Sequence, residues 1–151
     1  MGSSRMRILK SWIALSLITF IPHLFWESFH ISLYGGYDNL SPYLPISIWA
    51  TIGDVFYTLA IVGLISVFKN NLHWIENRMS KKDIISLAVA GFLVALSVEY
   101  KAIALDRWFY LPNMPVIPIL EVGLSPILQM TLLLPLSVYV TGKVIALVRS
   151  Q

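Results

Sequence analysis

Hydrophobic residues occupy four long stretches of the chain, and few charged residues interrupt them. Each stretch approaches the roughly 20 apolar residues that an α-helix needs to cross the hydrocarbon core of a bilayer. We therefore predict four transmembrane helices, at about residues 8–30, 46–68, 83–105 and 119–148. The predicted fold of residues 1–151 is a single all-α domain, an integral membrane four-helix bundle.

The composition supports a membrane protein rather than a water-soluble domain. Apolar residues make up 57% of the chain and charged residues 13%, and the mean hydropathy is +0.74. Charged residues are about 25% of an ordinary soluble domain. The chain has no cysteine, which removes disulfides, thiolate catalysis and Cys-ligated metal sites from consideration.

Basic residues indicate which way the chain crosses the membrane, because Lys and Arg favour the cytoplasmic flanks of short-looped membrane proteins. They gather before the first stretch, between the second and third, and near the end of the fourth. We predict that both termini are cytoplasmic and that the net charge of +3 reflects this bias rather than binding to nucleic acid. The basic inner loop then lies within reach of anionic lipid. The residues concerned are Arg5, Arg7, Lys10, Lys69, Arg78, Lys81, Lys82, Lys143 and Arg149.

Four acidic residues lie in or beside the apolar stretches, and all four map to the predicted outer side: Glu27, Asp54, Glu99 and Glu121. A charged side chain at the bilayer centre costs roughly 2.5–3.5 kcal/mol on insertion scales. Four such residues on one side predict a shared polar pocket in the outer half of the bundle. Asp54 and Glu99 have apolar sequence on both sides and rank first as proton-handling catalytic residues, with Glu27 and His30 next.

Helical periodicity places further polar and aromatic side chains near these acids. In the third stretch, Gly91, Ala95 and Ala102 share a face with Glu99. Small residues allow close packing of membrane helices, so we expect this face to point inward. The side chains that we expect to contact a ligand are His23, Trp26, Tyr34, Thr58, Arg107, Trp108, Tyr110, Glu121 and Gln129.

Some of these residues have a second interpretation. Trp26 and Trp108 also suit the aromatic belt at a membrane interface. Arg107 is either a counter-ion that folds over the acids or an anchor for lipid phosphate.

The first stretch contains the spacing His23-x-x-x-Glu27-x-x-His30. Its Glu-x-x-His step occurs in carboxylate-bridged metal sites of helical bundles, which makes these three residues candidate metal ligands. Such sites have a second Glu-x-x-His, which this chain lacks. The favoured interpretation is therefore that His23 and His30 pair with carboxylates and satisfy buried polar groups.

The segment 111–118 has proline at every third position, at Pro112, Pro115 and Pro118. Proline at this density excludes a helix. We predict a stiff, extended lid over the outer face of the bundle.

His23-x-x-x-Glu27, with Trp26 beside it, resembles the sterol isomerase (EXPERA) type of small helical membrane enzyme over these few residues. The likeness implies acids and aromatic side chains that act on an isoprenoid-derived ring.

A broader pattern consists of Trp26-Glu27, Gly53-Asp54, Glu99, Arg107-Trp108-x-Tyr110, Met114-Pro115-x-x-Pro118 and Gly123-Leu124-x-Pro126-x-x-Gln129. This pattern spans most of the chain and resembles a group of small bacterial four-helix inner-membrane proteins that carry no assigned function. The resemblance implies a multi-pass protein of the bacterial inner membrane whose outer side is periplasmic. The chain departs from the group at Glu121, where a small or apolar residue is expected.

Together these features predict an acidic pocket that binds or modifies a small apolar molecule of the lipid or isoprenoid type. Crowded carboxylates cannot all ionise, so one can donate a proton while another accepts it. Whether the chain is an enzyme stays open at this stage, and no cofactor is indicated. One alternative is a proton- or cation-coupled transporter or channel subunit, which at this size would act as a homo-oligomer and needs a polar path past Thr58. Another is a membrane assembly subunit.

Overall fold

The computed structural model describes residues 2–36 and 45–150. Four long helices make up most of this part of the chain, and each is long and apolar enough to cross a membrane. Their bounds are α1 (Gly2–His30), α2 (Ile46–Phe68), α3 (Lys81–Ala104) and α4 (Leu124–Arg149). The predicted all-helical fold is thus confirmed.

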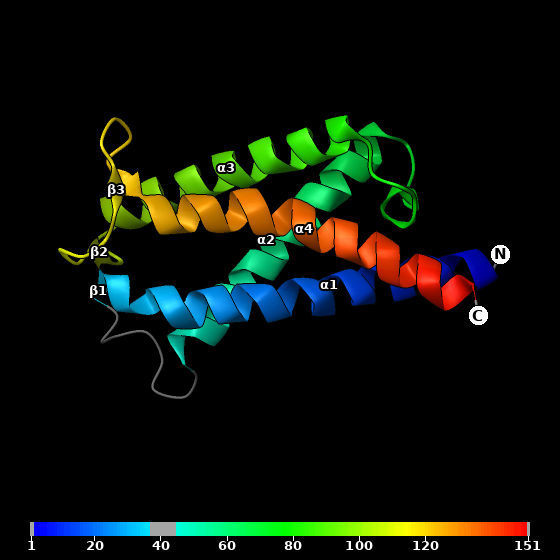
Figure 1. Cartoon of the computed structure of the whole chain (residues 1–151), viewed down its shortest axis with the longest axis horizontal. Coiled ribbons are helices and arrows are strands. Elements are labelled where there is room, and N and C mark those ends of the chain that lie inside the picture. The colour runs from blue at the N-terminus through cyan, green and yellow to red at the C-terminus, as the bar shows by residue number, and fades with distance from the viewer. Residues whose placement is uncertain (1, 37–44, 151) are drawn as a thin grey trace.

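The connections between the helices gather at the two ends of the bundle (Figure 1). One end carries two antiparallel strand pairs, whereas the other carries both chain ends and the connection from α2 to α3. We call these the strand end and the basic end. The short elements are η1 (Ile31–Leu33), β1 (Tyr34–Gly35), η3 (Trp74–Glu76), β2 (Phe109–Tyr110), β3 (Val116–Ile117) and β4 (Val122–Gly123).

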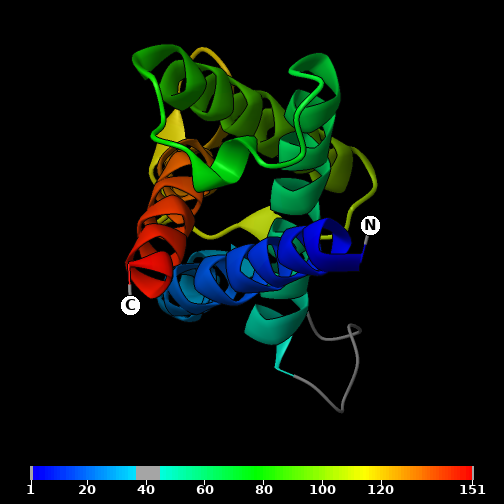
Figure 2. The same cartoon turned by 90° about the vertical axis from the view of Figure 1, so that its right-hand side faces the viewer.

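The four helices do not pack evenly against one another. Contacts are extensive between α1 and α2, between α1 and α4, and between α3 and α4, but sparse between α2 and α3. The reason is visible in Figures 1 and 2, where α2 crosses the bundle obliquely while the other three helices run along it. The seam between α2 and α3 is therefore the loosest of the bundle.

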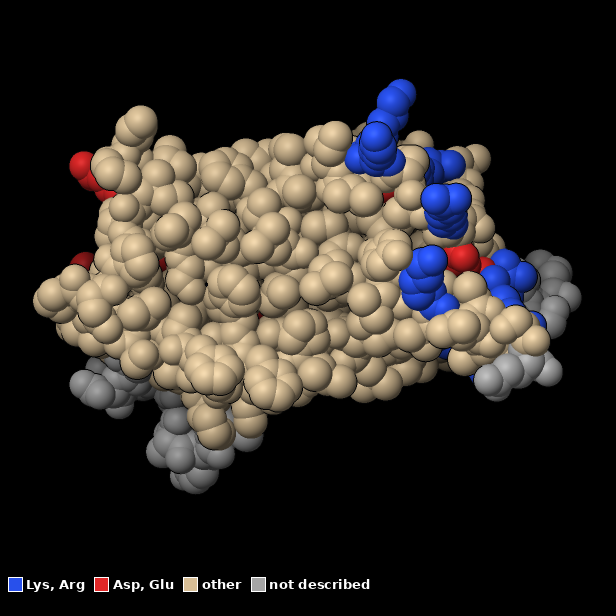
Figure 3. Space-filling view, in the orientation of Figure 1, with Lys and Arg blue, Asp and Glu red and all other residues tan. Residues whose placement is uncertain are grey.

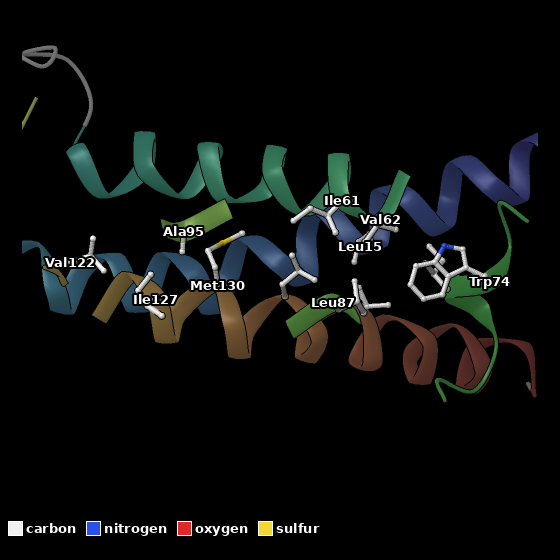
Figure 4. Close-up of a cluster of buried hydrophobic side chains, with 12 residues drawn as sticks. Leu15, Ile61, Val62, Trp74, Leu87, Ala95, Val122, Ile127 and Met130 are labelled. Atoms are coloured by element: carbon white, nitrogen blue, oxygen red, sulfur yellow. The ribbon is translucent and has the colours of Figure 1, made fainter. Parts of the chain in front are cut away.

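A buried apolar cluster runs along the bundle, from Val122 at the strand end to Trp74 at the basic end (Figure 4). Leu15, Val62 and Leu87 are fully buried within it and lie between the helices, near Trp74 (Figure 4). The indole of Trp74 donates a hydrogen bond of 2.8 Å to Ser66 Oγ, which satisfies its polar atom.

The helix boundaries differ from the prediction mainly at the starts of α1 and α4, and α4 was placed at residue 119 but begins at Leu124. Residues Val116 and Ile117 pair with Val122 and Gly123, so the chain forms a hairpin where we expected helix. The proline segment is non-helical as predicted, but its second half is paired in this hairpin instead of forming a free extended lid. The start of α1 was also placed too late, at residue 8.

A buried carboxylate, Glu76, joins three elements at the basic end. Its side chain is 1% exposed and forms ion pairs with Arg7 of α1 at 2.8 Å and Arg149 of α4 at 2.6 Å. Ser11 Oγ and His73 Nδ1 lie 2.8 and 3.0 Å from Glu76 Oε1. Burial raises the pKa of Glu76, but the hydrogen bonds from His73, Arg149, Ser11 and Arg7 outweigh it and lower the pKa to about 2. The carboxylate is therefore charged at neutral pH.

The close approach of α3 to α4 depends on a glycine, and this gives a first prediction. A Cβ atom at Gly91 would lie 2.4 Å from the backbone oxygen of Met130, so even alanine forces the helices apart. We expect Gly91→Ala to lower the free energy of unfolding by about 1–3 kcal/mol, the usual cost of overpacking. Gly53→Ala is the matched control, because a Cβ there meets nothing within 4 Å and alanine is about 1 kcal/mol better than glycine in a helix. Unfolding in mixed detergent micelles measures both variants, and equal stability of the two would contradict the predicted contact.

Candidate functional site

Three helices contribute to a hydrogen-bonded network near the strand end. The amide nitrogen of Gln129 on α4 lies 2.8 Å from Glu27 Oε1 on α1 and 2.8 Å from Asp54 Oδ2 on α2. His23 Nδ1 lies 3.0 Å from the same Asp54 oxygen. One amide thus bridges two carboxylates, and an imidazole supports one of them.

The N–H groups in this network determine which ring nitrogen of His23 carries a hydrogen. With both carboxylates ionised, the two N–H groups of Gln129 are used by Glu27 and Asp54. His23 Nδ1 then carries a hydrogen and donates it to Asp54, which leaves a lone pair on Nε2. Nε2 is fully buried and has no partner among the described residues. An unpartnered buried polar atom is costly, so Nε2 is a part of this network that the described residues leave unsatisfied.

A second branch reaches Glu27 from the other side. Trp26 Nε1 donates to Ser125 Oγ at 3.1 Å, and Ser125 Oγ lies 2.8 Å from His30 Nδ1. His30 Nε2 in turn lies 3.0 Å from Glu27 Oε2. The donors therefore form a chain that ends on the carboxylate. The expectation that both histidines pair with carboxylates agrees with the structure.

Glu99 on α3 has a separate set of partners from the strand end. Its carboxylate accepts hydrogen bonds from the hydroxyls of Tyr34 and Tyr110, at 3.3 and 2.5 Å, and from Trp108 Nε1 at 3.4 Å. The pairing of β1 with β2 places Tyr34 opposite Tyr110 and brings both rings to the acid. Burial and the Glu99 carboxylate raise the pKa of Tyr110, so this phenol stays a protonated donor at neutral pH.

A cavity of about 520 Å³ lies between Glu99 on one side and the linked carboxylates of Glu27 and Asp54 on the other. Its walls come mainly from α2 and α3, on either side of the loosely packed seam, and α1 and α4 close the back. Trp49 and Tyr57 on its edge are 50% and 37% exposed, so the cavity reaches the outer surface of the bundle between α2 and α3. The lining residues are Glu27, His30, Tyr34, Ile46, Trp49, Ala50, Gly53, Asp54, Tyr57, Val94, Ala95, Val98, Glu99, Arg107, Trp108, Pro126, Gln129 and Met130.

Most of the predicted site residues line this cavity or touch a residue that does. His23, Trp26 and Tyr110 are absent from the lining. His23 and Tyr110 form hydrogen bonds with the lining residues Asp54 and Glu99, whereas Trp26 reaches the lining residue His30 only through Ser125, which does not line the cavity. The remaining predicted residues, which line the cavity directly, are Glu27, His30, Tyr34, Asp54, Glu99, Arg107, Trp108 and Gln129.

Two predicted residues lie elsewhere. Glu121 was expected to be the fourth acid of the pocket, but it is exposed and occupies the turn of the β3–β4 hairpin, with a left-handed φ of 55°. The prediction was wrong because residues 119–123 do not continue α4, so the helical spacing that aimed Glu121 inward does not exist. Thr58 is fully buried below the cavity, and its hydroxyl has no partner among the described residues.

The hypothesis of a metal centre at His23, Glu27 and His30 finds no geometric support. Within residues 2–36 and 45–150, no group of three or more His, Asp or Glu side chains is arranged to hold a metal ion. His23 turns Nδ1 to Asp54, whereas Glu27 and His30 pair with each other. The three side chains are committed to different hydrogen bonds.

Ser125 shares the polar face of its helix with Gln129 but was not among the residues expected to contact a ligand. It lies in the first turn of α4 and links Trp26 to His30. Its four-residue spacing from Gln129 was the available signal, since residues at that spacing share a helix face.

Comparisons with protein-family models, curated proteins and solved structures gave no match to this chain. The function must therefore be argued from the site itself.

Proposed function

We propose that this chain is a multi-pass membrane protein whose four long helices cross the bilayer. The burial pattern of α1 supports this placement, because the helix hides its polar face and exposes its apolar one. Thr19 and His23 are at most 1% exposed, whereas Leu17 and Phe25 are both 63% exposed. A water-soluble helix would show the opposite arrangement.

The proposed orientation puts the basic end in the cytoplasm and the cavity in the outer half of the membrane. Lys and Arg gather at the basic end of the visible face, and the middle of that face carries none (Figure 3). This distribution is the one that the positive-inside rule requires. The resemblance to small bacterial inner-membrane proteins makes the bacterial inner membrane the proposed location.

We propose that the cavity binds a small apolar molecule of the lipid or isoprenoid type and modifies it by acid/base chemistry. A single observation carries this proposal: Glu99 and the pair of Glu27 and Asp54 line one largely apolar cavity from opposite walls, and each side has its own hydrogen-bond partners. Proton transfer at a carbon framework needs a donor and an acceptor within reach of the same bound molecule. Asp54, with His23 and Glu27, would serve on one wall, and Glu99 on the other.

The seam between α2 and α3 is the proposed entrance through which the ligand reaches the cavity. The cavity reaches the bundle surface there, beside exposed aromatic side chains and the small residues Ala50 and Gly53. A molecule dissolved in the outer leaflet could enter sideways without leaving the hydrocarbon phase. This access favours an apolar ligand over a water-soluble one.

The structure gives less support to proton- or cation-coupled transport. Such a role needs a polar path from the cavity to the basic end. Buried hydroxyls occur among the described residues there, but those of Ser66 and Thr141 donate to helix backbone. The fully buried apolar side chains Leu15, Val62 and Leu134 lie in the same part of the bundle. We therefore favour a ligand site that is open on one side only.

Filling the cavity tests the proposed binding site. Gly53 lines the cavity, and a Cβ there meets nothing within 4 Å. We expect Gly53→Phe to occupy the ligand volume and to lower the amount of co-purified apolar molecule about tenfold or more, because a phenyl ring and a bound molecule cannot fill the same space. Native mass spectrometry of the detergent-purified protein measures the adduct.

Gly53→Ala is the control, because it adds one methyl group to open space and should keep the adduct. An apolar adduct that persists unchanged in Gly53→Phe would place the ligand elsewhere. Absence of any adduct from the natural chain and from both variants would argue against a lipid pocket.

A further inference from the structure

A second hollow of about 550 Å³ lies at the basic end, remote from the cavity described above. The start of α3 and the last turns of α4 form its sides, and the segment that follows η3 forms its floor. Gly142 allows η3 to approach α4, because a Cβ there would lie 2.9 Å from the backbone oxygen of Ile75. The residues that matter for its chemistry are Asn77, Arg78, Ile84, Tyr139, Lys143 and Ala146.

The hollow carries positive charge that the described residues do not balance. Arg78 and Lys143 both line it, both are exposed, and neither forms an ion pair with a described acidic residue. Glu76 also lines the hollow, but its carboxylate is paired with Arg7 and Arg149, and the nearby Asp83 is paired with Lys69 at 2.7 Å. Two cations are thus free to bind an anion.

The surroundings of the two cations are apolar on the side facing the middle of the bundle. Ile84 is 43% exposed and Tyr139 is 46% exposed, and both border the hollow. Lys143 Nζ lies 5.5 Å from the centre of the Tyr139 ring, so its ammonium group is held at the edge of this apolar surface. Asn77 adds an amide beside Arg78. A ligand that fits must combine a negatively charged polar group with an apolar body.

We propose that this hollow binds the head group of an anionic phospholipid of the inner leaflet. Arg78 and Lys143 contact the phosphate, and the acyl chains follow the seam between α3 and α4. Basic pockets between membrane helices on the cytoplasmic side recognise anionic lipids in this way. The inference rests on the membrane placement proposed above and is independent of the chemistry in the outer cavity.

The test is a lipid titration of the full chain, followed by native mass spectrometry, with phosphatidylglycerol and phosphatidylcholine as the two probes. The test variant is Arg78→Gln with Lys143→Gln. The matched control is Lys81→Gln with Lys82→Gln, which removes the same charge from the same end but from residues that do not line the hollow. We expect one bound phosphatidylglycerol, an affinity about tenfold lower or more in the test variant, and little change in the control.

A second variant tests whether lipid binding needs the open volume of the hollow as well as its two cations. Ala146→Phe fills the hollow and keeps both cations, and we expect it to lose the phosphatidylglycerol as well. Equal losses in the test and control variants, equal binding of both lipids, or full binding by Ala146→Phe would each overturn the proposal. Complete competition by inorganic phosphate alone would also overturn it, because it would indicate a site for free phosphate. None of these outcomes depends on an apolar adduct in the outer cavity.

Discussion

Replacing Glu27 with Gln and Asp54 with Asn together is expected to slow proton exchange between solvent and the bound apolar molecule by about a hundredfold or more. General acid/base groups contribute about 10²–10⁴-fold to proton-transfer rates. The two amides keep the size of the carboxylates, but they can neither release nor accept a proton at neutral pH. Incubation of the ligand-loaded protein in D₂O, followed by mass spectrometry of the extracted molecule, measures the exchange.

The control for this experiment is Glu121→Gln. Glu121 is an exposed acid at the same end of the bundle and does not line the cavity. The Glu121→Gln variant should therefore leave both ligand binding and proton exchange unchanged.

Glu99→Gln alone should slow exchange while the molecule stays bound, because the hydroxyls of Tyr34 and Tyr110 can still donate to an amide oxygen. Full deuterium incorporation in the double variant would reject acid/base chemistry at these residues and leave only a binding role.

The sequence predicts the helices well because their signal is local. The length of an apolar run and its flanking charges determine where a membrane helix forms, and α2 spans Ile46–Phe68, as predicted. The start of α4 was missed because it depends on pairing between residues 116–117 and 122–123. Such a hairpin competes with the helix through tertiary contacts that an apolar run does not encode.

The sequence predicts which site residues share a face of one helix. Helical spacing places His23, Glu27 and His30 on the face of α1 that the structure buries. It does not say how the helices are rotated about each other. The bridge from Gln129 to Glu27 and Asp54 joins residues 102 and 75 positions apart and needs the packed bundle.

The role of Glu76 was not predicted at all. The sequence assigns residues 69–82 to a basic inner loop, where an acid is expected to face water. The apolar pair Trp74-Ile75 beside Glu76 was the signal for burial, since exposed loops seldom carry two such residues in a row. The convergence of Arg7 and Arg149, from the two ends of the chain, appears only in the fold.

Glu76→Ala is expected to lower the free energy of unfolding by about 2–3 kcal/mol. Removing one partner of a buried ion pair costs about 3–5 kcal/mol when the remaining charge stays buried. Here Arg7 and Arg149 are 53% and 41% exposed, so water solvates them partly and the cost falls below that range. Asp106→Asn is the control: it removes one exposed charge, and Asn tolerates the left-handed φ of 49° at that position. Unfolding in mixed micelles at neutral pH measures both variants.

The pH dependence of stability separates the charge of Glu76 from its packing. The pKa of this carboxyl is about 2 in the folded protein, against an ordinary value of 4.5. A lowered pKa means that the unfolded chain takes up the proton first, so the stabilisation is complete above about pH 4.5 and is lost as the pH falls toward 2. The natural chain should therefore lose stability over this interval more steeply than Glu76→Gln, which cannot titrate there. The difference in unfolding free energy between the two proteins should shrink steadily with falling pH, because both then carry a neutral group at position 76. A difference that stays constant from pH 5 to pH 2.5 would mean that Glu76 contributes by packing alone and that the ion pairs with α1 and α4 do not hold the basic end together.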